Sequence, residues 1–193
     1  MKRSLPLIIG IAAGLLLGWY LFPLALYSRS EQPLQFSHVV HTGEKGGMSC
    51  TDCHTTNEQG RFQGIPATAK CGECHAAPLG TTETEKKLVD EYITPGKEIP
   101  WKVYYRQPDN AVFSHASHVT VGGMKCEQCH GDHGSSAALK VYQVNRISGY
   151  SRDIWGPNIS GIPSQEWEGM KMDKCIRCHQ QQHRRDGCIA CHK

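Results

Sequence analysis

All ten cysteines of this chain occur in Cys-x-x-Cys pairs, and a histidine directly follows each of the five pairs. We call them motif 1 (residues 50–54), motif 2 (71–75), motif 3 (126–130), motif 4 (175–179) and motif 5 (188–192). Two thiols at this spacing can add to the two vinyl groups of one porphyrin edge, and the adjacent histidine can bind the iron. Zinc sites and disulfides also use Cys-x-x-Cys, but they leave the five histidines unexplained. The pattern predicts five covalently bound haem c groups.

The motifs assign two sets of cofactor-binding residues. The thioether cysteines are expected to be Cys50, Cys53, Cys71, Cys74, Cys126, Cys129, Cys175, Cys178, Cys188 and Cys191. The proximal iron ligands are expected to be His54, His75, His130, His179 and His192.

Six histidines lie outside the motifs and are candidate distal ligands: His38, His41, His115, His118, His133 and His183. An iron with two histidine ligands is saturated and suits electron transfer, whereas an open position would allow substrate or gas chemistry. Six candidates are enough to saturate five irons. An isolated histidine such as His183 is also typical of a surface residue. Four methionines near the motifs are alternative ligands that would raise the haem potential, or packing residues: Met48, Met124, Met170 and Met172.

The sequence contains an internal duplication, at about residues 36–75 and 113–192. Each half runs Phe-Ser-His-x-x-His, Cys-x-x-Cys-His, Gly-Ile-Pro, Cys-x-x-Cys-His, and the second half adds motif 5. If the Phe-Ser-His-x-x-His segments are short helical turns, their two histidines lie on one face, about 60° apart. Such histidines can bind two different haems. One would serve its own downstream motif and the other a neighbouring motif.

The predicted fold is a mostly irregular and α-helical multihaem cytochrome c, similar to class III cytochromes, with little β-structure. Residues 31–193 offer roughly 33 residues per haem, so the porphyrins must supply most of the buried apolar surface. A helix is expected over residues 82–93, with a capping box at Thr82 and Glu85 and a stop at Pro95-Gly96. Residues 101–105 could form an edge strand or a docking segment. The haem-free stretch 131–174 is either a partner-docking loop or a wrapping around a haem.

Residues 1–30 are predicted to form a retained transmembrane anchor, and residues 31–193 an exported haem domain. Positions 4–28 carry no charge and, as a helix, would extend about 37 Å, enough for a bilayer core of about 30 Å. Lys2 and Arg3 would stay cytoplasmic, which places the haem domain on the periplasmic side of the inner membrane. A cleaved signal peptide usually has a shorter apolar region of about 7–15 residues. Because position 36 follows the anchor closely, motif 1 is expected to lie nearest the membrane.

Three stretches carry a family resemblance: "GWYLFPLALYS" running into "QPLQFSHVVH", then "PWKVYYRQPDNAVFSHASH", and the closing "CIRCHQQQHRRDGCIACHK". They resemble the multihaem cytochrome c subunit of the menaquinone reductase complex (Qrc) of sulfate-reducing bacteria. The pentahaem subunit of alternative complex III, which oxidises quinol, is similar too. The resemblance implies partners of three kinds: a molybdopterin-oxidoreductase-like subunit, an iron–sulfur subunit and a polytopic quinone-binding membrane subunit. It also implies a soluble periplasmic multihaem cytochrome c as electron donor. The Qrc subunit is described as hexahaem, so the spare histidine leaves room for a sixth haem.

Three functional classes remain after these observations. An electron-transfer subunit, not an enzyme by itself, is favoured by the anchor and the histidine supply. A free-standing multihaem reductase would need an open iron, and a haem sensor would need only one haem and a signalling domain. The net charge of +3 gives no indication of nucleic-acid binding.

Overall fold

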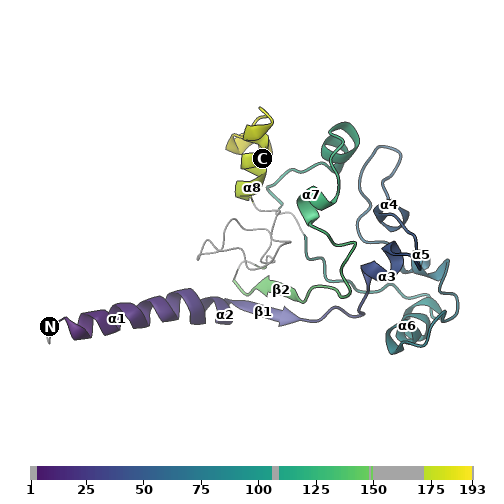
Figure 1. The fold of residues 1–193 in the computed structure, drawn as a ribbon, viewed down its shortest axis with the longest axis horizontal. Helices are drawn as coiled ribbons and strands as arrows, with labels where there is room; N and C mark the ends of the chain where they lie inside the picture. The colour runs from purple at the N-terminus through teal and green to yellow at the C-terminus, as the bar shows by residue number, and fades with distance from the viewer. Residues whose placement is uncertain (1–3, 106–108, 148, 150–171, 193) are drawn as a thin grey trace.

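The computed structural model of the chain describes residues 4–105, 109–147, 149 and 172–192. Residues 150–171, which include much of the haem-free stretch, the second Gly-Ile-Pro and Met170, lie outside these residues. In the described part, short helices alternate with long irregular connections, as expected for a chain with a small side-chain core (Figure 1).

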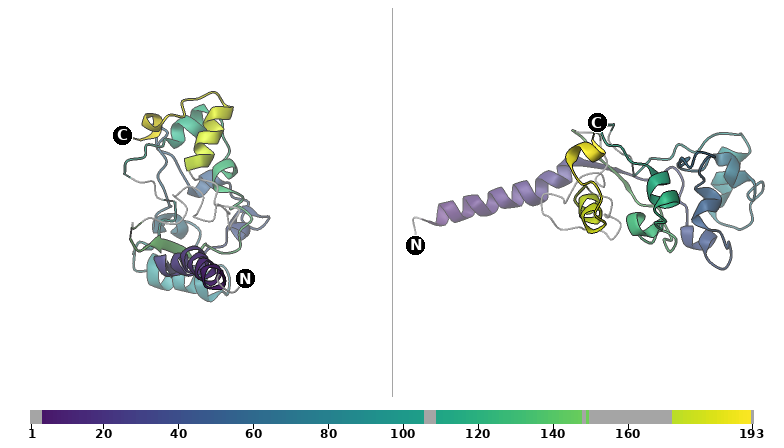
Figure 2. Two further views of the ribbon diagram at one scale, coloured as in Figure 1. Left: turned by 90° about the vertical axis from the view of Figure 1, so that its left-hand side faces the viewer. Right: turned by 90° about the horizontal axis from the view of Figure 1, so that it is seen from above.

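The first elements are α1 (Leu5–Leu16), the π-helical η1 (Leu17–Leu21) and α2 (Phe22–Leu26), which follow one another without a gap. They extend away from the rest of the chain (Figures 1 and 2). No side chain of α1 is buried. Taken one by one, the helices in the described residues are too short or too polar to cross a membrane.

A two-stranded antiparallel sheet follows the helical run. Strand β1 (Tyr27–Ser30) pairs with β2 (Tyr142–Asn145), with Tyr27 opposite Asn145. The Arg146 N–H also donates to the Leu26 carbonyl over 2.9 Å. Part of the haem-free stretch 131–174 is therefore fixed to the end of α2. As predicted, the described residues contain little β-structure.

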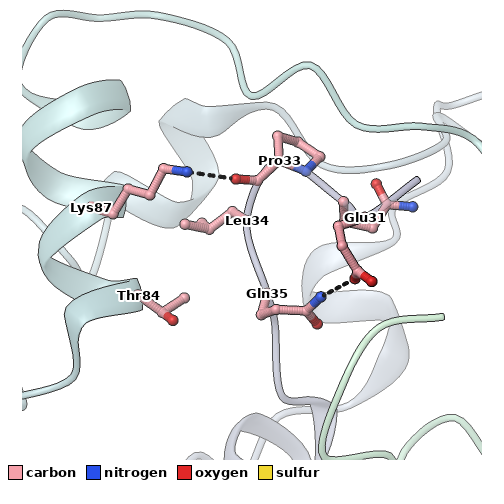
Figure 3. A pocket seen from close by; sticks show the side chains of 7 residues that line it. Glu31, Pro33, Leu34, Gln35, Thr84 and Lys87 are labelled. Atoms are coloured by element: carbon pink, nitrogen blue, oxygen red, sulfur yellow. Dashed lines mark hydrogen bonds between the residues drawn. The ribbon is translucent and has the colours of Figure 1, made fainter. Parts of the chain in front are cut away.

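The buried core is small and lies under α6 (Glu83–Leu88). Leu34, Leu88 and Ile99 are buried together, and Trp101 packs against them. The Lys87 ammonium donates to the Pro33 carbonyl over 2.9 Å and holds the segment around Leu34 against α6 (Figure 3). So few buried apolar side chains agree with the expectation that porphyrins supply most of the buried apolar surface.

The helix predicted over residues 82–93 is confirmed as α6 followed by the π-helical η2 (Val89–Ile93). The Thr82 hydroxyl caps it by accepting from the Glu85 N–H at 3.2 Å. The helix ends before Pro95-Gly96, where Gly96 has a φ of 65°. Only half of the predicted capping box forms. The Glu85 carboxylate accepts the Leu79 and Gly80 N–H groups of the preceding loop and not the Thr82 N–H.

Residues 101–105 are not a strand, so that alternative for the segment is wrong. The Lys102 N–H donates to Gln32 Oε1 over 3.0 Å, and Gln32 Nε2 donates to the Lys102 carbonyl over 2.9 Å. A side-chain amide thus satisfies the backbone groups that a neighbouring strand would have used.

The remaining helices are α3 (His38–Thr42), α4 (Cys50–Cys53), α5 (Thr68–Gly72), the π-helical η3 (Ala116–Val121), α7 (Glu127–His130), α8 (Met172–Gln181) and α9 (Cys188–Cys191). Measured along the axis of α1, helix α8 with motif 4 lies nearer to α2 than α4 with motif 1 does (Figure 1). The expectation that motif 1 lies nearest the apolar helix is therefore wrong. Residues 31–37 form no helix, and Leu34 among them joins the core under α6.

Replacing Thr68 by valine tests the small core. Thr68 is 5% exposed, and its hydroxyl accepts the Ile99 N–H at 2.9 Å. The variant leaves that N–H without an acceptor, so we expect the free energy of unfolding to fall by about 1–3 kcal/mol in denaturant titrations of the holoprotein. The matched control is Thr94→Val at an exposed position, and an equal loss in both variants would contradict this role of Thr68.

Candidate functional site

The two Phe-Ser-His-x-x-His segments are short helical turns, as predicted. The first is α3, and the second is η3 with His115 at its N-cap. In both, the phenylalanine ring stacks on the second histidine: Phe36 on His41 at 4.3 Å and Phe113 on His118 at 4.5 Å between ring centroids. The same two rings meet the first histidine edge-on, at 4.9 and 4.8 Å. The phenylalanine therefore orients both histidines of its turn.

The serine of each turn fixes the proton of the second histidine. Nδ1 of His41 lies 2.8 Å from the Ser37 carbonyl oxygen, and Nδ1 of His118 lies 2.8 Å from that of Ser114. A carbonyl oxygen only accepts hydrogen bonds, so Nδ1 of each ring must carry the proton. The Nε2 lone pair is left for a metal, which is the usual arrangement of a metal-binding histidine.

The Gly-Gly-Met sequence that recurs in both halves closes the turn onto the motif. The methionine N–H donates to the carbonyl of the second histidine, over 2.9 Å for Met48 and 3.1 Å for Met124. The glycine before it has a positive φ, 61° at Gly47 and 65° at Gly123, which glycine adopts without steric cost. The backbone conformation that closes the turn therefore explains why these residues recur. A ligand role for the methionine sulfurs stays a prediction, and Met172 is exposed at the start of α8.

Four pairs of histidine rings have the spacing of two ligands on one metal, and three of them include a motif histidine. With metal–nitrogen bonds of about 2.0–2.1 Å, two imidazoles on opposite sides of a metal place their ring centres about 6.3 Å apart. The observed centroid distances are 6.1 Å for His41 and His75, 5.9 Å for His118 and His179, and 6.4 Å for His115 and His130. Each of these three pairs joins one motif histidine with one histidine outside the motifs.

The pairs follow a rule that links the two repeats. The second histidine of each turn is paired with the histidine of the second motif that follows it in the sequence, and not of the first. His41 is thus paired with motif 2, and His118 with motif 4. The first histidine of the second turn, His115, faces its own motif 3. The duplication thus interleaves neighbouring motifs.

The first histidine of the first turn, His38, has two neighbours. Its ring lies 6.2 Å from that of His133. Burial lowers the pKa of His38, and the nearby His54 of motif 1 lowers it further. Nδ1 of His38 lies 3.2 Å from the Ser136 hydroxyl, so its Nε2 is also available to a metal.

The last two candidates differ from the other four. Nε2 of His133 lies 3.0 Å from the Tyr105 hydroxyl, so this histidine uses for a hydrogen bond the nitrogen that the others leave available. His183 is exposed just beyond α8 and has a left-handed φ of 51°.

The motif histidines are held mostly through Nδ1. His54 lies 3.2 Å from the Gly64 carbonyl oxygen, and His179 lies 2.7 Å from that of Arg185. His75 instead lies 2.8 Å from a carboxylate oxygen of Glu85. In motif 5, Nδ1 of His192 is buried without a hydrogen-bond partner. Its backbone bridges to Ala111, just before the second turn.

Burial keeps several of these histidines neutral. It lowers the pKa of His130 to about 4, with His115, Lys140 and His54 contributing in that order. Burial and Lys140 likewise lower the pKa of His133 to about 4, and burial lowers the pKa of His115. The neutral imidazole is the form that binds a metal.

The five motifs form a series of spatial neighbours, and none of the ten cysteines forms a disulfide. The influence of one thiol on another shows which motifs are adjacent. Burial raises the thiol pKa of five cysteines, and a thiol of another motif raises each further: Cys53 for Cys71, Cys74 for Cys53, Cys126 for Cys50, Cys178 for Cys129, and Cys129 and then Cys191 for Cys175. The resulting order is motif 2, motif 1, motif 3, motif 4 and motif 5.

These residues fit haem c. Each motif offers two free thiols, and the ring centres of three histidine pairs have the spacing that two axial ligands need. In the described part of the chain, no three His, Cys, Asp or Glu side chains gather as a separate metal site. Sequence reasoning missed Glu85, because its position three residues after Thr82 indicated a helix cap. It also missed Tyr105 beside His133, for which no motif gives a signal.

Comparison with known proteins agrees with this chemistry. Residues 40–143 match the family model of cytochrome c3. The chain is 38% identical to the menaquinone reductase multihaem cytochrome c subunit of Nitratidesulfovibrio vulgaris (strain Hildenborough), over 97% of this chain and 89% of that protein. The predicted family is thereby confirmed: the chain belongs to the cytochrome c3 family of multihaem c-type cytochromes, and it is a homologue of the menaquinone reductase cytochrome subunit.

Proposed function

We propose that the chain is the membrane-anchored electron-transfer subunit of a quinone reductase complex and passes electrons from a soluble periplasmic cytochrome c toward menaquinone. The observation that carries this proposal is the set of histidine pairs at about 6 Å, which would give three of the five irons two histidine ligands. A haem c held in this way supplies a one-electron redox centre with no open position for a substrate. The homology to a menaquinone reductase subunit supports the quinone end of the path.

The ligand assignment follows the rule of the repeats. His41 and His75 would bind one haem, His118 and His179 a second, and His115 and His130 a third. By analogy with His115, His38 would serve its own motif 1 together with His54, which is among its close neighbours. His192 of motif 5 would take its partner from His133 or His183.

This assignment gives five covalent haems and leaves one histidine over. A sixth haem would then have at most one histidine ligand from this chain. We therefore expect five haems per chain in haem-content measurements on the native protein, all retained after extraction with acidified organic solvent. A sixth, extractable haem would show that the spare histidine serves a non-covalent site.

We propose that residues 1–30 anchor the chain in the inner membrane. The consecutive helical segments from Leu5 to Leu26 would extend about 33 Å, against a bilayer core of about 30 Å. Their large apolar side chains are mostly exposed, as a lipid-facing helix requires. Lys2 and Arg3 at the start favour a cytoplasmic N-terminus and a periplasmic haem domain. The anchored protein should stay in the membrane pellet after a carbonate wash, and release by that wash would contradict the anchor.

The arrangement of the motifs supports a direction for the path. Helix α8, which carries motif 4, lies nearer the apolar helix than α5 does (Figure 2). Motifs 4 and 5 would then face the polytopic quinone-binding subunit, and motif 2 would face the soluble cytochrome. The molybdopterin-oxidoreductase-like and iron–sulfur subunits would complete the complex.

The native complex provides the direct test of this function. We expect the purified complex to reduce a menaquinone analogue when a reduced soluble multihaem cytochrome c is supplied, because two-ligand haems carry electrons and do not bind substrate. The measurement is quinone reduction followed optically. Oxidation of menaquinol with reduction of a soluble acceptor, and no reaction in the opposite direction, would instead favour the relationship to alternative complex III.

Replacing His118 by alanine tests the ligand rule. The variant removes one ligand from the haem of motif 4, so we expect one high-spin ferric haem per chain in the optical and electron paramagnetic resonance spectra. To identify which haem His118 binds, His118→Ala is repeated in two variants, each of which lacks the cysteines of one motif. With Cys175 and Cys178 replaced by alanine, motif 4 carries no covalent haem and His118→Ala should add no high-spin signal. With Cys126 and Cys129 replaced, it should still add one, and the reverse pattern would assign His118 to motif 3.

A further inference from the structure

The histidine of motif 2 has a hydrogen-bond partner unlike those of the other histidines. Nδ1 of His75 lies 2.8 Å from Glu85 Oε1, and the two side chains are only 19% and 13% exposed. The other described Nδ1 contacts are with neutral oxygens: His38 with Ser136 Oγ, and His41, His54, His118 and His179 with the carbonyls of Ser37, Gly64, Ser114 and Arg185. In these contacts, only His75 faces a carboxylate.

The Glu85 carboxylate is held in place by three donors. Oε1 accepts from the Leu79 N–H at 2.7 Å as well as from His75, and Oε2 accepts from the Gly80 N–H at 2.8 Å. Each carboxylate oxygen accepts a backbone N–H, an arrangement that favours the ionised form of the group. A Cβ at position 80 would lie 2.9 Å from Oε2, which shows how closely the loop encloses the carboxylate.

A negative acceptor on Nδ1 changes the imidazole as an iron ligand. A carboxylate that accepts the Nδ1–H raises the basicity of the ring, and a more basic Nε2 stabilises ferric iron more than ferrous iron. A neutral carbonyl or hydroxyl acceptor does this less. Among haems with the same two axial ligands, the one bound by His75 should therefore be the most difficult to reduce.

We propose that Glu85 lowers the reduction potential of the haem bound by His75 below the potentials of the other haems of this chain. The proposal rests on the proposed role of His75 as an iron ligand. Motif 2 stands at the end of the motif series that is far from the apolar helix (Figure 1). The most reducing site of the chain thus lies where a soluble donor would dock, and electrons would move to higher potential along motifs 1, 3, 4 and 5.

Replacing Glu85 by glutamine tests the proposal in the full-length holoprotein within its complex. Glutamine keeps the shape and an acceptor oxygen but removes the charge. In a potentiometric titration followed optically, we expect the component of lowest potential to become easier to reduce. Its ratio of reduced to oxidised haem at a fixed potential should rise by about tenfold, which is about 59 mV for one electron. The matched control is Glu83→Gln, an exposed carboxylate on the same helix, which should move no component.

A second variant locates the component independently. His41→Met replaces the opposite ligand of the same haem, and a methionine ligand raises the potential, so the same lowest component should move upward. If either variant changes the potential of a different component of the titration, the lowest potential does not belong to this haem and the proposal is overturned. If His41→Met moves the lowest component and Glu85→Gln moves none, only the role of Glu85 is overturned. If His41→Met moves nothing, the ligand assignment under the proposed function fails as well.

Discussion

The second histidine of each Phe-Ser-His-x-x-His turn is the element on which the rest of the structure depends. A stacked phenylalanine, a serine carbonyl on Nδ1 and a methionine N–H on the histidine carbonyl hold it in the same way in both repeats. Nε2 is left for a metal, and the ring centre of each of these histidines lies about 6 Å from that of a motif histidine. With haems bound as proposed, these pairs would cross-link a chain that has few buried side chains.

The interleaving of motifs explains why so irregular a chain can have one defined arrangement. Under the proposed assignment each repeat would contribute a ligand to the motif after its own, which would require adjacent motifs to lie side by side. The cysteines of the five motifs do form one neighbouring series. The side-chain core under α6 closes the end of the series at motif 2. The sheet of β1 and β2 fixes the connection between the repeat region and the apolar helix.

The sequence predicted the features that depend on local spacing. The Cys-x-x-Cys-His motifs, the helical turns and the helix over residues 82–93 each follow from residues within one or two turns of one another. The pairing of His41 with His75 and the proximity of motif 4 to α2 depend on contacts between distant segments, which no local spacing encodes. Glu85 was interpreted as a cap because the spacing from Thr82 fits one, yet the Leu79 and Gly80 amides and His75 compete for the same carboxylate. Residues 101–105 have strand-forming side chains, but Gln32 satisfies their backbone.

The central claim is that the histidine pairs saturate the irons, and the electron paramagnetic resonance spectrum of the intact, oxidised native protein tests it most directly. Irons with two histidine ligands are low-spin, so low-spin ferric signals should account for all the covalent haems. A strong high-spin ferric signal from the intact protein, integrating to one haem per chain or more, would contradict the claim and indicate an open iron.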